Sequence, residues 1–337
     1  MKPVARLFLL LPLAACSRNP SAVLDAAGPH ARATETLFWV FIAVNGLIWF
    51  AVLGVLFYFL ARNRRPRLEA PVETTPATER RPRLYIAAAL GATVLILTGF
   101  VGYSYAVDRQ LIGFDSHPQL EIEVTGHQWW WEIRYSGATP SDGFVTANEI
   151  HVPVGTRVKL KLQSADVIHS VWFPNLAGKR DVIPGHDEEL VIEADRPGIW
   201  NGRCAEFCGL QHAYMGLRLV AEPRAQFDRW QAAQRLPAPD PVTVEAVFGQ
   251  QVFNTGPCAM CHTIRTTTTS GYSSTAPELT HLMSRGTIGA GAAPNRTGYL
   301  GGWIVDPHGI KPGVHMPTIQ QNSRDYQALL AYLETLK

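Results

Sequence analysis

Four of the five cysteines in this 337-residue chain stand in two short motifs with metal-ligand spacing. The first motif, at residues 204–215, reads C-A-E-F-C-G-L-Q-H-A-Y-M and brings two thiols, an imidazole and a thioether together. Zinc would suit two cysteines and a histidine, but the thioether favours copper, whose electron-transfer sites use methionine to tune their potential. Two thiols four residues apart could bridge two coppers, and His169 is the candidate for the second histidine that bridging needs.

The second motif, at residues 258–262, reads C-A-M-C-H, which is the spacing for covalent attachment of a c-type haem. In such a motif Cys258 and Cys261 bind the vinyl groups of the haem, and His262 is an axial ligand of the iron. The chain is therefore predicted to hold two redox metal groups.

The sixth iron ligand is predicted to be Met316, in the segment K-P-G-V-H-M-P at residues 311–317. This segment resembles the methionine loop of class I cytochromes c. Of the other candidates, Met260 lies inside the attachment motif and cannot reach across the haem. Met283 and His315, the residue before Met316, are weaker alternatives.

Residues 118–222 must position the copper ligands, and they alternate apolar and polar side chains in short runs separated by Pro and Gly turns. This pattern is typical of a β-sandwich or barrel. The ligand motif falls on the loop before a closing strand at 216–221, as in cupredoxins, where a rigid β scaffold holds the ligands. An all-β cupredoxin domain is therefore predicted.

A proline-rich hinge at residues 236–242 precedes the haem motif. Residues 244–253 are predicted to form a helix leading into the motif, and residues 323–336 have the periodicity of an amphipathic closing helix. Residues 243–337 are therefore predicted to be an all-α class I cytochrome c domain.

Two uncharged apolar runs, at residues 36–60 and 84–107, each exceed the roughly 20 residues that a membrane-spanning helix needs. The loop between them, 61–83, is rich in arginine and is predicted to be cytoplasmic. The N-terminal segment 16–35 and everything after about residue 108 would then lie outside.

Residues 1–15 have a basic start and an apolar run, which indicates a signal peptide. The ending L-A-A-C resembles a bacterial lipobox and makes Cys16 a candidate for lipidation; an ordinary signal or a leading helix with a chance cysteine is the alternative. Every cysteine then has a role outside disulfides. A net charge of +2 argues against a nucleic-acid binder.

Three long stretches resemble cytochrome c oxidase subunit II: G-H-Q-W-W-W-E-I-R-Y at 126–135, D-V-I-H-S-V-W-F-P-N-L-A-G-K-R-D-V-I-P-G at 166–185, and the copper motif at 204–215. The order of lipobox, two spans, cupredoxin domain and haem domain resembles the bacterial form with a fused cytochrome c. The resemblance covers essentially the whole mature chain.

The resemblance implies a dinuclear copper A centre, with both cysteines bridging the coppers, one histidine on each, a weak methionine ligand and a backbone carbonyl from Glu206. Its ligands map onto His169, Cys204, Glu206, Cys208, His212 and Met215. In the family the carboxylate of this glutamate also reaches a magnesium ion at the boundary with subunit I. His117, His127, His151 and His186 are expected to be surface or hydrogen-bonding groups.

The run Trp129-Trp130-Trp131 would place its first and third rings on one face of a strand, where packing is the simplest interpretation. In the family an exposed aromatic of this run admits electrons to copper A, and Trp129 is the matching position. A fused haem could instead deliver electrons by another face.

One stretch departs from the family. The start of the second span lacks the acidic residue and W-T-x-x-P pattern linked to proton uptake, and Glu79, among arginines, is expected to be a solvated loop residue. The proton-entry role is therefore not carried over from the family, and Glu79 as a stand-in for the missing acidic residue is the alternative.

The resemblance implies an electron-entry subunit that takes electrons onto haem c, then copper A, and passes them to haem in subunit I, where oxygen is reduced and protons are pumped. Its partners would be subunit I, the other oxidase subunits, and a donor such as a cytochrome c or complex III, in the bacterial inner membrane. A nitric oxide reductase subunit and a stand-alone tethered carrier are the alternatives. A quinol oxidase subunit is disfavoured, because that branch lacks the copper ligands.

Overall fold

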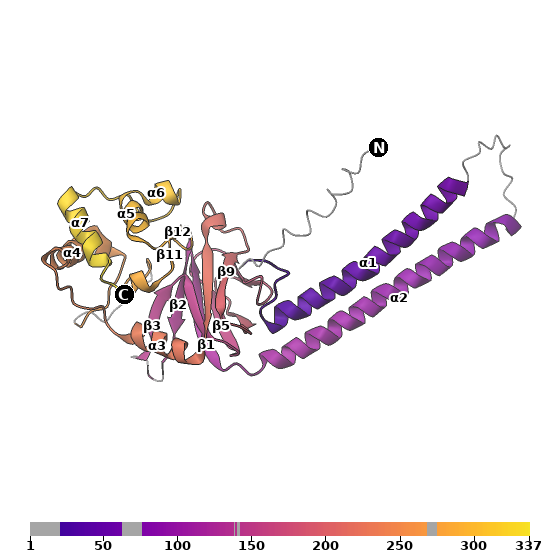
Figure 1. Cartoon of the computed structure of the whole chain (residues 1–337), viewed down its shortest axis with the longest axis horizontal. Coiled ribbons are helices and arrows are strands. Elements are labelled where there is room, and N and C mark those ends of the chain that lie inside the picture. The colour runs from indigo at the N-terminus through magenta and orange to yellow at the C-terminus, as the bar shows by residue number, and fades with distance from the viewer. Residues whose placement is uncertain (1–20, 63–75, 138, 140–141, 268–274) are drawn as a thin grey trace, which may run out of the picture. The chain divides into compact units, whose positions relative to one another are not determined.

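The computed structural model describes residues 21–62, 76–137, 139, 142–267 and 275–337 (Figure 1). The described residues fall into two compact units: those within 32–117, and those within 21–31 together with those within 118–337. The signal peptide, the candidate lipidation site Cys16 and most of the predicted arginine-rich loop lie outside the described residues.

The smaller unit consists of two helices, α1 (Pro29–Arg62) and α2 (Pro76–Asp115), each long and apolar enough to cross a membrane. Their apolar side chains are largely exposed, and the rings of Phe41 and Phe100 meet 5.7 Å apart. Helices that present apolar side chains all round need an apolar surrounding, as a bilayer provides.

Both helices extend beyond the predicted spans of 36–60 and 84–107. The prediction of a loop through residue 83 was wrong for residues 76–83, which form the start of α2. Glu79 and Arg83 are one helical turn apart and form an ion pair there, which supports the helix locally. Glu79 is thus a helical residue rather than a loop residue.

Two five-stranded sheets form the β domain, with strand orders β3-β2-β1-β5-β8 and β4-β10-β9-β6-β7. The first sheet contains β1 (Leu120–His127), β2 (Trp130–Tyr135), β3 (Phe144–Ala147), β5 (Val158–Ser164) and β8 (Glu188–Ile192). The second contains β4 (Glu149–Pro153), β6 (His169–Trp172), β7 (Arg180–Val182), β9 (Gly198–Cys204) and β10 (Gly216–Glu222).

Alternate residues of these strands fill one core, as the period-two pattern predicted. On β1, for example, Ile122 and Val124 are buried, and on β5 Val158, Leu160 and Leu162 are buried. The predicted β-sandwich is confirmed.

Helix α3 (Arg224–Arg235) follows β10 and was not predicted from the sequence. Its Phe227 is buried in the sandwich core, and its Trp230 stacks on His151 with ring centroids 4.0 Å apart. Trp230 also meets Tyr135 and Phe144 edge-on. An amphipathic pattern in this segment was the signal that could have revealed the helix.

Replacing Trp230 by alanine should destabilise the β domain, because the aromatic cluster loses its central ring. We expect a loss of about 3 kcal/mol, which lowers the unfolding midpoint of the purified protein by roughly 6–12 °C. Arg229→Ala, at an exposed position on the same helix, is the control and should shift the midpoint little. Equal shifts in both variants would contradict this packing role.

The C-terminal domain is helical, as predicted. Its elements are α4 (Val244–Thr255), the short 3-10 turns Pro257–Met260 and Leu282–Ser284, a two-stranded ribbon of β11 (Thr287–Ile288) and β12 (Ala293–Pro294), α5 (Thr297–Val305), α6 (Pro307–Ile310) and α7 (Ser323–Leu333). Helices α4 and α7 cross closely at Gly249, where a β-carbon would collide with the Ala328 carbonyl. Phe253, Leu329 and Tyr332 are among its core residues.

The segment predicted as a hinge, residues 236–242, is attached to the C-terminal domain. The amide of Ala238 donates to the Arg265 carbonyl at 2.8 Å, and the Leu236 carbonyl lies 3.0 Å from His281 Nε2. This linker is therefore held along one domain.

Candidate metal centres

The copper motif forms the loop between β9 and β10, which we call the copper loop (residues 204–215). Cys204 ends β9, and its amide donates to the Met215 carbonyl at 3.0 Å, which closes the loop at its base. His169 begins β6, the neighbour of β9 in the same sheet, where Val171 pairs with Cys204. Sheet pairing thus brings a histidine 35 residues away beside the loop.

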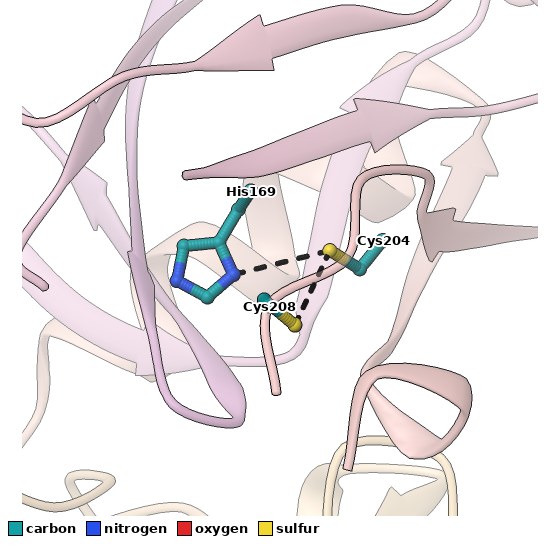
Figure 2. Close-up of side chains that lie close together, drawn as sticks. All are labelled: His169, Cys204 and Cys208. Carbon is teal, nitrogen blue, oxygen red and sulfur yellow. Dashed lines mark hydrogen bonds between the residues drawn. The ribbon is translucent and has the colours of Figure 1, made fainter. Parts of the chain in front are cut away.

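His169, Cys204 and Cys208 are buried, and their ligand atoms all lie within 4.8 Å of one another (Figure 2). The two sulfurs are 3.7 Å apart, and Cys204 Sγ is 3.9 Å from His169 Nδ1. Cys208 Sγ is 3.7 Å from His212 Nδ1 and 3.8 Å from the sulfur of Met215.

Glu206 contributes to this cluster through its backbone. Its carbonyl oxygen lies 3.2 Å from Cys204 Sγ, while its carboxylate lies apart from the cluster, half-exposed and 3.8 Å from Lys179 Nζ. The carbonyl and the carboxylate therefore face different surroundings.

The pKa values of the two thiols are shifted in opposite directions. A hydrogen bond from the Cys208 thiol, helped by one from His169, lowers the pKa of Cys204 to about 3. The Cys204 thiolate in turn raises the pKa of Cys208, as does burial. Cys204 would therefore offer a thiolate to a metal ion, and Cys208 would have to lose its proton in order to bind one.

Neighbouring residues orient the side chains of the candidate ligands. Asp166 Oδ1 lies 2.8 Å from His169 Nε2, which leaves Nδ1 of that ring facing Cys204. The indole N–H of Trp129 donates to the Cys208 carbonyl at 2.9 Å, and the side-chain amide of Gln128 donates to the same carbonyl at 2.7 Å. Such partners fix ring orientation and loop position. Sequence reasoning missed Asp166 and Gln128.

Gly126 on β1 makes room for His169. A β-carbon at this position would lie 2.8 Å from the His169 ring, closer than side chains approach, so the imidazole would have to move. We expect Gly126→Ala to lower copper affinity by about 10- to 100-fold, measured by competitive copper titration. Gly178→Ala, where a β-carbon meets nothing within 4 Å, should bind copper normally; equal affinities in both variants would contradict this role.

The donor set fits a dinuclear copper centre. It offers two thiols that can bridge, an imidazole beside each, a thioether and a carbonyl, all positioned by paired strands. Soft sulfur and imidazole donors in this number suit copper.

The haem motif lies on the turn after α4. The ring of His262 hydrogen-bonds through Nδ1 to the Pro277 carbonyl at 2.7 Å, which leaves Nε2 for iron. Burial lowers the pKa of His262, so the ring is held in the neutral form that binds metal. Cys258 and Cys261 are free thiols, and burial raises the pKa of Cys258.

The candidate sixth ligands lie in different surroundings. Met260 is 81% exposed on the turn itself, and Met283 packs against the domain core. Met316 is half-buried in the loop before α7, and its role as the second axial ligand stays a prediction.

The tryptophan run is not a continuous strand. Trp129 lies in the turn before β2, and Trp130 and Trp131 begin that strand. Trp129 and Trp131 are buried, as a shared face predicts, but Trp129 is only 5% exposed. Its ring contacts the ring of His315 with centroids 4.8 Å apart, so the exposed aromatic of the family pattern is covered here.

Comparison with known proteins gives two family matches. Residues 142–222 match "Cytochrome C oxidase subunit II, periplasmic domain", and residues 246–337 match "Cytochrome c". Cytochrome c oxidase subunit 2 of Alkalihalophilus pseudofirmus is 32% identical over 98% of this chain and 95% of its own length. The subunit 2 of Synechocystis is 39% identical over 38% of each chain.

Two further matches cover only part of this chain. A quinol oxidase subunit 2 of Bacillus cereus is 27% identical over 66% of this chain and 76% of its own length. Among solved structures, the periplasmic domain of subunit II of cytochrome oxidase from Bradyrhizobium japonicum is 28% identical, with a TM-score of 0.34, and covers 35% of this chain and 95% of its own.

Proposed function

This chain belongs to the cytochrome c oxidase subunit II family, and we propose that it passes electrons from a covalently bound haem c to a dinuclear copper A centre and on to haem in subunit I. It is an oxidoreductase subunit: oxygen is reduced in subunit I, with proton translocation. Haem and copper supply one-electron chemistry when bound, and the residues of this chain supply their ligands and fix their surroundings.

The observation that carries this proposal is the convergence of the copper donors. Four side chains and one carbonyl of the copper loop meet His169 from another strand, with neighbouring donor atoms 3.2 to 3.9 Å apart. A rigid, buried cage of this kind keeps its geometry when the charge of its metal changes. The same set favours an oxidase that takes electrons from a cytochrome over one that takes them from quinol.

We assign the copper A ligands to His169, Cys204, Glu206, Cys208, His212 and Met215. The haem would be attached through Cys258 and Cys261, with His262 and Met316 as axial ligands. Paired His and Met ligands raise the potential of a haem above that of bis-histidine haems, which suits transfer onward to copper.

Trp129 is proposed as the residue through which electrons enter the copper site. Its indole N–H donates a hydrogen bond to the Cys208 carbonyl, and its ring contacts the ring of His315, the neighbour of Met316. Because this ring is covered by the haem domain, external donors would deliver their electrons to the haem.

The remaining assignments follow the family. The half-exposed carboxylate of Glu206 is available for a magnesium ion shared with subunit I, because it faces away from the sulfur cluster. We place the two helices in the bacterial inner membrane, with both metal domains on its periplasmic side and Cys16 as a lipidation site.

The test is metal and haem analysis of the purified oxidase, with a low-temperature EPR spectrum of its copper. We expect two coppers and one haem c in this subunit, and one unpaired electron shared by both coppers. A single copper with localised hyperfine splitting, or zinc in its place, would overturn the copper assignment. Purification without a haem-containing partner subunit would instead favour a stand-alone electron carrier.

A further inference from the structure

Lys311 is a buried lysine that joins the two metal domains. It is 1% exposed, and its ammonium group donates to the Trp129 carbonyl of the cupredoxin domain at 2.7 Å and to the Gly289 carbonyl of the haem domain at 3.0 Å. A buried ammonium is costly unless hydrogen-bonded, so these bonds tie its position to both carbonyls.

The residues after Lys311 also contact the copper loop. We call residues 311–317 the methionine loop, because Met316 lies in it. The side-chain amide of Gln211 donates to the Pro312 carbonyl. Gly313 has a left-handed backbone, with φ +84°. It lies against Leu210, because a β-carbon at this position would be 3.3 Å from the Leu210 side chain. The loop that carries one proposed haem ligand therefore lies on the loop that carries most of the copper ligands.

A second group of contacts lies in the segment 286–291 of the haem domain. The buried carboxylate of Glu149 accepts from the Gly286 amide at 2.8 Å and pairs with Arg218 at 3.1 Å. The amide of Gly216, the first residue of β10 after the copper loop, donates to the Ala290 carbonyl at 2.8 Å. Gly289, Ala290 and Gly291 all have positive φ, a backbone path that turns successive carbonyls toward Lys311 and Gly216.

We propose that Lys311 is a positioning residue that fastens the methionine loop onto Trp129 and so holds the haem domain docked on the copper loop. This inference rests on the proposed electron route. Domains joined by a linker are expected to move relative to one another unless their interface prevents it. Here two sets of hydrogen bonds resist both separation and rotation of the haem domain.

Docking has two functional consequences. The haem-to-copper step needs no diffusional search, because the two sites keep one distance and orientation. The same contact covers Trp129, so that soluble donors meet only the exposed side of the haem domain.

The test uses the purified oxidase with the full chain, and compares Lys311→Met, which keeps the stem but removes the donors, with wild type. Lys161→Met, at a half-exposed position on β5 paired with Glu121, is the matched control. Haem c is reduced by a flash-activated ruthenium donor, and the haem-to-copper rate is followed optically. Hydrogen exchange of the peptide containing Gly216 reports docking without reference to turnover.

We expect Lys311→Met to slow the haem-to-copper step about tenfold or more through misplacement of the two sites. Exchange at Gly216 should rise, and the step should become sensitive to glycerol viscosity, while the copper EPR signal, the haem spectrum and the copper-to-subunit I rate stay unchanged. Lys161→Met should match wild type. Unchanged rate and exchange in Lys311→Met would overturn the proposal.

The wild-type enzyme gives an independent test if the variant does not assemble. If the domains are docked, the haem-to-copper rate should be independent of viscosity. A rate that falls as viscosity rises would show that the haem domain moves before each transfer, and would overturn the proposal. A wild-type enzyme without the shared-electron copper signal would instead refute the proposed function itself, which separates the two failures.

Discussion

Cys208→Ser should abolish the dinuclear copper signal and nearly all oxygen consumption driven by an external donor. Cys208 Sγ stands within 3.8 Å of three other donors, on Cys204, His212 and Met215, so its loss removes the proposed bridge and the contact between the two halves of the site. A hydroxyl is a hard, weakly acidic replacement for a thiolate. We expect the loss of activity to exceed the roughly 10- to 100-fold that removal of an outer-shell partner costs.

EPR and metal analysis of the purified complex measure this outcome, beside steady-state oxygen consumption. Phe207→Leu, in the same loop at a largely exposed position, should keep two coppers and near-normal activity. Retention of two coppers with a shared electron in Cys208→Ser would show that this thiol does not bridge them.

Removal of both proposed haem-binding thiols, in the double variant Cys258→Ala and Cys261→Ala, should leave the copper centre intact and stop electron entry from soluble donors. The proposed copper ligands lie in a different domain, on β6, β9 and the copper loop. The covering of Trp129 by His315 should prevent a soluble cytochrome from bypassing the missing haem. We expect normal copper EPR, no haem c absorbance and at least about 100-fold lower donor-driven turnover, since positioning of a donor is worth this much or more.

Met260→Leu is the control for this variant, because Met260 lies between the two thiols and is largely exposed. It should keep the haem and its activity. Donor-driven turnover that persists without haem c would show that electrons reach copper A directly, and would contradict the covered entry proposed here.

Much of the local structure followed from sequence pattern because short-range rules govern it. Alternating residues predicted β1 and β5, since one face of each strand is buried in the sandwich. The spacing of Cys258, Cys261 and His262 predicted a cytochrome c domain, which the family match confirms, while haem attachment at these residues stays a prediction. Helix α3 was not predicted although its amphipathic pattern indicates a helix; its position against Tyr135 and Phe144 could not be predicted, because it depends on a surface built by distant strands.

The sequence by itself determined which donor side chains the proposed metal sites contain, where the two long apolar helices lie and, through long motifs, the family. Tertiary structure alone decided what surrounds those ligands. Asp166 orients His169, Gly126 leaves space for its ring, and Lys311 reaches a carbonyl 182 residues away. Sequence spacing can reveal a set of ligands when one loop supplies them. Contacts between loops of different domains depend on how sheets pair and how domains dock, and no local sequence pattern specifies either.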